Sequence, residues 1–146
     1  MERLTDDNVR DVLSGLAREY GVRLYFNGKT NSLGQARYWG RSISINKDQP
    51  TASMVSVFFH ELGHIHCYDE GKWRSYHNTK PPYKMTDREK QLMIRTALRA
   101  ERWIDRWARR EMRKHFPRLR YITNYGDNGV AAQFLNELKS ELCPGK

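Results

Sequence analysis

The chain has little cysteine, no long apolar run and no secretory leader. Its two cysteines, Cys67 and Cys143, do not form a C-x-x-C pair, so the sequence offers neither a disulfide framework nor a zinc ribbon. No apolar stretch approaches the roughly 18 residues that a membrane-spanning helix needs. The first residues also lack the apolar core of a signal peptide. These absences predict a cytoplasmic protein without a membrane segment.

The composition is that of a small globular protein with an excess of positive charge. The 146 residues are 38% hydrophobic, which predicts one domain over residues 1–146. The net charge of +9 attracts polyanions. Much of the charge lies in an arginine-rich segment, residues 88–113, which makes nucleic acid one candidate partner. A simply solvated helix face is the commoner meaning of such a pattern.

The most informative stretch is an H-E-x-x-H motif over residues 60–64, at the end of an apolar run. Two histidines four residues apart on a helix, His60 and His64, project from the same face and can bind one Zn²⁺. Glu61 points about a quarter-turn away, where it can act on water without being a ligand. Gly63 costs roughly 1 kcal/mol against alanine in a helix interior, which indicates close packing at that point.

The periodicity of the remaining chain predicts an α+β fold. We expect a small three-stranded sheet packed on the motif helix, with an N-terminal helix, a long third helix and a C-terminal helix. The first expected helix is capped by Thr5 or Asp6 and ends at Gly21, and the motif helix covers 51–68. A long helix begins with the capping box Thr86 to Glu89 and ends near His115, and a last helix lies within 130–138. The expected strands are 22–26, 35–39 and 42–46.

A catalytic zinc ion takes three protein ligands, so a third must follow the motif. The longer H-E-x-x-H-x-x-G-x-x-H pattern is excluded because Cys67 and Glu70 stand where it needs glycine and histidine. Glu101, 37 residues after His64 (101 minus 64), lies in the apolar stripe of the long helix and is the favoured ligand. His77 and His115 are the alternatives.

Asp105 lies one helical turn after Glu101 and can orient a ligand imidazole through a hydrogen bond. For both carboxylates the competing explanation is a buried ion pair with an arginine. That competing explanation is stronger for Asp105 than for Glu101.

Together, these features resemble a minimal gluzincin metallopeptidase of the ImmA/IrrE group. The resemblance covers roughly residues 22–112 and is carried by His60-Glu61-Leu62-Gly63-His64 and by Glu101-Arg102-Trp103-Ile104-Asp105-Arg106-Trp107-Ala108. Ile104 departs from the group, which usually has alanine there, and no helix-turn-helix domain is evident. The resemblance implies that an extended substrate adds to the edge of strand 42–46 or of its neighbour.

The predicted function is zinc-dependent hydrolysis of peptide bonds in a specific intracellular protein, with one Zn²⁺ and Glu61 as general base. Four side chains are candidates to stabilise the oxyanion: Tyr121, Tyr125, His77 and His115. One alternative is a DNA-associated protease resembling the SprT group, which would use a third histidine ligand. The other is a non-catalytic binding module in which zinc only stabilises the fold.

Overall fold

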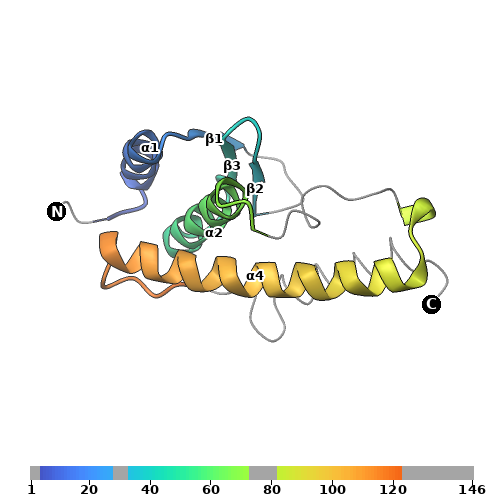
Figure 1. Ribbon diagram of the computed structural model, residues 1–146. Coiled ribbons are helices and arrows are strands. Elements are labelled where there is room, and N and C mark those ends of the chain that lie inside the picture. Colours follow the sequence, from blue (N-terminus) through green and yellow to red (C-terminus); the bar gives the residue numbers. More distant parts are fainter. Residues whose placement is uncertain (1–3, 28–32, 73–81, 123–146) are drawn as a thin grey trace. The chain divides into compact units, whose positions relative to one another are not determined.

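The computed structural model describes residues 4–27, 33–72 and 82–122 (Figure 1). These residues belong to two compact units, the first formed by residues up to His66 together with 107–122, and the second by 67–106 within the described ranges. Helices α2 (Thr51–Asp69) and α4 (Asp87–His115) have residues in both units. The expected C-terminal helix lies outside the described residues, and the prediction of a single domain stays a prediction.

Helix α1 (Val9–Tyr20) begins later than the sequence indicated. Asn8 is its N-cap residue, and the carbonyl of Thr5 accepts hydrogen bonds from the backbone N–H groups of Asn8 and Val9. A turn therefore precedes the helix where Thr5 or Asp6 was expected to cap it. The predicted C-terminus is confirmed, because Gly21 adopts the left-handed conformation, with φ 71°, that ends many helices.

The sheet has three strands in the order β1-β3-β2. Strand β1 (Arg23–Asn27) pairs in parallel with β3 (Ser42–Asn46), whereas β2 (Gly34–Arg37) pairs with β3 in antiparallel fashion. Strand β3 alternates as predicted, with Ile43 and Ile45 fully buried. Because β3 is central, both of its edges are taken, so strand 42–46 cannot itself receive a substrate strand. In the described part of the chain, its neighbours β1 and β2 form the edges.

Helix α2 carries the motif through the core of the first unit. Residues 53–65 are all buried, so this helix has no solvated face over thirteen consecutive residues. The core also includes Val9, Leu13, Leu16, Ala17, Ile43, Ile45, Ala108 and Met112, from α1, β3 and the end of α4. Burial on all sides explains why apolar residues occur around the whole circumference of this helix and are not confined to one stripe.

The long helix α4 begins with the predicted capping box. The Thr86 side chain accepts a hydrogen bond from the Glu89 N–H at 3.1 Å, and the Glu89 carboxylate accepts one from the Thr86 N–H at 3.3 Å. In the second unit the helix buries Ile94, Ala97, Ala100, Glu101 and Ile104, while a short 3₁₀ helix, η1 (Pro82–Lys84), precedes it. No helix in the described ranges is both long and apolar enough to cross a bilayer.

Candidate metal centre

His60 and His64 lie one turn apart on α2 and turn their rings toward each other. Their Nε2 atoms are 3.1 Å apart, and the side chains are 1% and 7% exposed. The rings meet edge to face with centroids 4.9 Å apart. The spacing of four residues in the sequence thus produces the paired imidazoles that the motif predicts.

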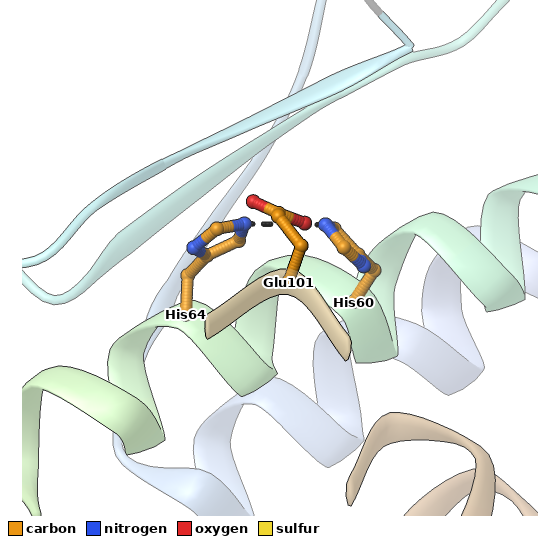
Figure 2. A group of neighbouring side chains, drawn as sticks. All are labelled: His60, His64 and Glu101. Carbon is orange, nitrogen blue, oxygen red and sulfur yellow. Dashed lines mark hydrogen bonds between the residues drawn. The ribbon is translucent and has the colours of Figure 1, made fainter. Parts of the chain in front are cut away.

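Glu101 on α4 supplies a carboxylate to the same position. The ligand atoms of His60, His64 and Glu101 all lie within 4.8 Å of one another, and Glu101 is 5% exposed. In Figure 2 the carboxyl group lies beside the gap between the two rings. Sequence reasoning chose this glutamate because it interrupts an apolar stripe, and a buried carboxylate needs a partner of opposite charge or a metal.

These three residues fit a zinc ion. Two nitrogens bound tetrahedrally to zinc at about 2.0–2.1 Å stand roughly 3.3 Å apart, close to the 3.1 Å between the histidine Nε2 atoms. Two imidazoles and one carboxylate are also the ligand set of many catalytic zinc sites, which keep a fourth position for water. The site therefore has donor types that suit zinc, and the two histidine nitrogens have the spacing of two zinc ligands.

Tyr121 contacts the other nitrogen of a candidate ligand. Its hydroxyl oxygen is 3.4 Å from His60 Nδ1, and the residue is 8% exposed. The next residue holds it there, because the Ile122 N–H donates a 2.9 Å hydrogen bond to the Ser56 hydroxyl, one turn before His60 on α2. Sequence reasoning singled out Tyr121 only as an oxyanion donor. The long-range contact with Ser56 has no signal in the sequence.

Strand β2 passes directly beside Glu61. A Cβ atom added to Gly34 would be 3.4 Å from Cγ of Glu61 and 2.3 Å from Cγ1 of Val57. Glu61 is 6% exposed. Just after β2, the ring of Tyr38 lies 6.0 Å from the His64 ring, centroid to centroid. Neither Gly34 nor Tyr38 was recognised from the sequence as a neighbour of the motif.

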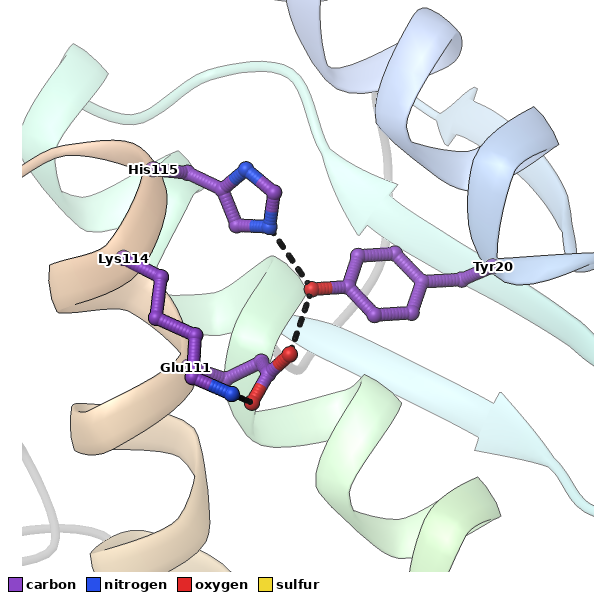
Figure 3. A network of polar contacts seen from close by, with 4 residues as sticks. All are labelled: Tyr20, Glu111, Lys114 and His115. Atoms are coloured by element: carbon purple, nitrogen blue, oxygen red, sulfur yellow. Dashed lines mark hydrogen bonds and ion pairs between the residues drawn. The ribbon is translucent and has the colours of Figure 1, made fainter.

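His115 takes part in a different network in the first unit (Figure 3). Its Nε2 lies 2.8 Å from the Tyr20 hydroxyl oxygen, which also donates to the Glu111 carboxylate at 2.9 Å. Lys114 pairs with the other oxygen of Glu111 at 3.0 Å. The His115 ring also stacks on Phe59.

The remaining titratable side chains near the motif and the long helix have varied positions. His66 stacks on Trp107, with ring centroids 4.7 Å apart, and Asp105, the predicted orienting carboxylate, is half-buried. Cys67 is fully buried. Burial raises the pKa of its thiol to about 11, with a further increase from the Glu101 carboxylate and an opposing effect of Lys72. His77 and Tyr125 lie outside the described residues.

A helix that carries H-E-x-x-H, together with an inward-facing glutamate on a later helix, defines a metallopeptidase-type site. The family model described as the IrrE N-terminal-like domain, a peptidase family, matches residues 17–119, and the chain belongs to this family. No curated protein and no solved structure gives a significant match to the chain. The matched range contains the motif and Glu101, so the resemblance seen in the sequence is confirmed.

Proposed function

We propose that the protein is a zinc-dependent endopeptidase of the gluzincin type, with His60, His64 and Glu101 as the zinc ligands. The observation that carries this proposal is the convergence of three buried ligand atoms within 4.8 Å. Membership of a peptidase family supports the same reaction class. A specific intracellular protein is the proposed substrate.

Zinc, when bound, would supply Lewis-acid chemistry that makes water attack on a peptide carbonyl feasible at neutral pH. The carboxylate of Glu61 then takes a proton from the attacking water as the new C–O bond forms. Glu61 returns this proton to the amide nitrogen as the C–N bond breaks, which releases a carboxylic acid and an amine. The proposed role of Tyr121 is to hold His60 through its Nδ1.

Strand β2 is the proposed edge for the substrate. It is an outer strand of the sheet, and its first residue, Gly34, approaches Glu61 closely. An extended peptide that added to β2 would gain main-chain hydrogen bonds and run past the proposed general base. This arrangement requires no deep pocket and leaves specificity to the side chains along the strand.

The test separates the general base from the metal ligands. Glu61→Gln and the unmodified protein should each bind about one equivalent of zinc, but the variant should lose proteolysis by at least about 100-fold, the size of a general-base contribution. Activity is measured by mass spectrometry of new N-termini in a cell extract incubated with each zinc-loaded protein. Glu70→Gln, which changes an exposed carboxylate, is the matched control and should cleave normally. Full cleavage by Glu61→Gln would overturn the mechanism.

Replacement of Glu101 tests the third ligand. Glu101→Ala should reduce the zinc content in metal analysis, since only two protein ligands would remain. Stoichiometric, tightly bound zinc in this variant would show that another residue is the ligand. A third histidine would then favour the SprT-like alternative. Stoichiometric zinc on the unmodified protein without zinc-dependent cleavage would favour the non-catalytic binding module.

A further inference from the structure

The exposed side of α4 in the second unit is a surface of one charge type. Five arginines, at positions 88, 95, 99, 102 and 106, are all exposed. At about 100° per residue they fall within an arc of about 60° around the helix axis. They extend over 18 residues (106 minus 88), or about 27 Å at 1.5 Å per residue. We call these five residues the arginine face.

The acidic residues of this part of α4 lie elsewhere. Glu101 is buried among the candidate ligands, and Asp105 is half-buried. On the helical projection they fall about 120° and 80° from Arg95, outside the arginine face. Glu89 is engaged in the capping box with Thr86. Asp87, in the first turn, also falls about 80° from Arg95. Among the described residues of this part of α4, the carboxylates therefore lie outside the arginine face, and the positive field adds along the helix.

The chemistry of the face favours phosphate over other anionic partners. All five positions are arginine rather than lysine, and a guanidinium group forms paired hydrogen bonds with phosphate oxygens. A membrane surface is a poor match because an interfacial helix inserts an apolar face. Here the apolar side of the helix, with Ile94, Ala97 and Ile104, is already buried in the protein.

We propose that the arginine face of α4 binds the phosphate backbone of double-stranded DNA without regard to base sequence. Duplex DNA has one phosphate charge per about 1.7 Å of axis, so a 27 Å row of guanidinium groups would meet a dense linear array of phosphates. The face is separate from the residues proposed for catalysis. The proposal of DNA binding can therefore be tested independently of peptidase activity.

The experiment measures binding of the full chain to a 25-base-pair duplex of arbitrary sequence by fluorescence anisotropy between 50 and 200 mM salt. Five phosphate contacts give a slope of about −4.5 for log K against log salt concentration. Affinity should accordingly fall about 500-fold over this range. A change of only a few-fold would overturn the proposal.

A pair of charge-matched variants locates the surface. The test variant carries Arg95→Gln, Arg99→Gln, Arg102→Gln and Arg106→Gln, which keep a good helix former at each position. The control variant carries Arg10→Gln, Arg18→Gln, Arg23→Gln and Lys47→Gln, all at exposed positions in the first unit. Both variants reduce the net charge from +9 to +5 (9 minus 4). Circular dichroism verifies that each is folded.

The two variants should differ strongly. The test variant should bind at least about 100-fold more weakly at 50 mM salt, with a slope reduced by about 3.6, whereas the control should keep most of its affinity and its slope. Equal losses in both variants would mean that net charge alone attracts DNA and would overturn the proposal. Equal competition by duplex RNA or by poly-glutamate at matched charge would overturn the assignment to DNA.

Discussion

At the scale of single residues, the candidate metal centre depends on the contact of the second ring nitrogen of His60. His60 uses one ring nitrogen toward His64 and contacts Tyr121 with the other, at 3.4 Å. A hydrogen bond at Nδ1 would fix both the tautomer and the orientation of a zinc-binding ring. The hydroxyl of Tyr121 is thus the simplest group to remove in order to test this arrangement.

Tyr121→Phe should weaken zinc binding about 10- to 100-fold, because it removes the partner of His60 Nδ1 and keeps the ring that packs in the core. Zinc affinity is measured by competition with a chromophoric chelator. Tyr25→Phe, at a half-exposed position on β1, removes a hydroxyl elsewhere and should leave the affinity unchanged. An unaltered affinity in Tyr121→Phe would contradict a positioning role.

A second prediction concerns the pH dependence of the Tyr20 network. Burial raises the pKa of Glu111, but hydrogen bonds from Lys114 and Tyr20 outweigh this effect and lower it below the usual value. The charge of Glu111 therefore stabilises the fold fully above the pKa of the unfolded carboxyl group, about 4.3. This contribution is lost as the pH falls through the lower pKa of the folded state. Burial, together with the hydrogen bond to Glu111, raises the pKa of Tyr20, so its phenol stays protonated at neutral pH.

Glu111→Gln should be less stable than the unmodified protein by about 1 kcal/mol at pH 7, the value of a partly exposed charged hydrogen bond. The difference should shrink toward zero near pH 3. Urea unfolding at several pH values between 3 and 7 measures it. A difference that stays constant over this range would show that the charge of Glu111 is not responsible.

At the scale of secondary structure, close approach between β2 and α2 brings the outer strand to the motif. Gly34 has no room for a side chain, since a Cβ atom would lie 2.3 Å from Cγ1 of Val57, which is buried and β-branched. The small residue lets the strand pass next to Glu61. Packing between these two elements therefore sets the distance from the sheet edge to the proposed general base.

Gly34→Ala should destabilise the fold by about 1–3 kcal/mol through overpacking. Val57→Ala removes the clashing methyl group. The double variant should therefore lose at least about 1 kcal/mol less stability than the sum of the losses in the two single variants. Gly15→Ala is the matched control: in α1 a Cβ atom at this position would have nothing within 4 Å, so helix propensity should make it slightly stabilising. Thermal and urea unfolding measure all four variants, and strictly additive costs would contradict the clash.

Local patterns were sufficient to predict most elements. The bounds of β3, the Gly21 terminus and the Thr86–Glu89 capping box follow from alternation, a left-handed glycine and paired side-chain caps, all of which act within a few residues. The sheet order did not follow, because the parallel pairing of β1 with β3 depends on contacts between distant residues. The start of α1 was misplaced because Thr5, Asp6 and Asn8 are all good capping residues.

The candidate site was predictable to the same extent. His60 and His64 are fixed by helical spacing, and Glu101 was found because a carboxylate in an apolar stripe is costly. The contacts of Tyr121 with His60 and of Gly34 with Glu61 were not predictable, since each depends on how separate elements pack. The identity of the bound metal and the roles of Glu61 and Asp105 stay predictions.

At the scale of the whole molecule, a metal ion held by α2 and α4 would add to the stability of the fold. Zinc at 100 times its dissociation constant would contribute about 2.7 kcal/mol, which corresponds to a rise in the melting temperature of roughly 5–10 °C for a chain of this size. Differential scanning fluorimetry with excess zinc or with a chelator measures the shift. His64→Ala should abolish it, whereas His66→Gln, which changes the histidine stacked on Trp107, should retain it. An equal shift in His64→Ala would contradict the assigned ligands.

The burial of α2 around its whole circumference also bears on the rate of metal exchange. Residues 53–65 have no solvated side, and both histidines of the motif lie within this stretch. A metal ion bound there could dissociate only when neighbouring parts of the fold opened locally. The frequency of this local opening would therefore govern the residence time of the ion. A protein of this kind would carry its ion through dilution and purification, and once stripped it would reload slowly.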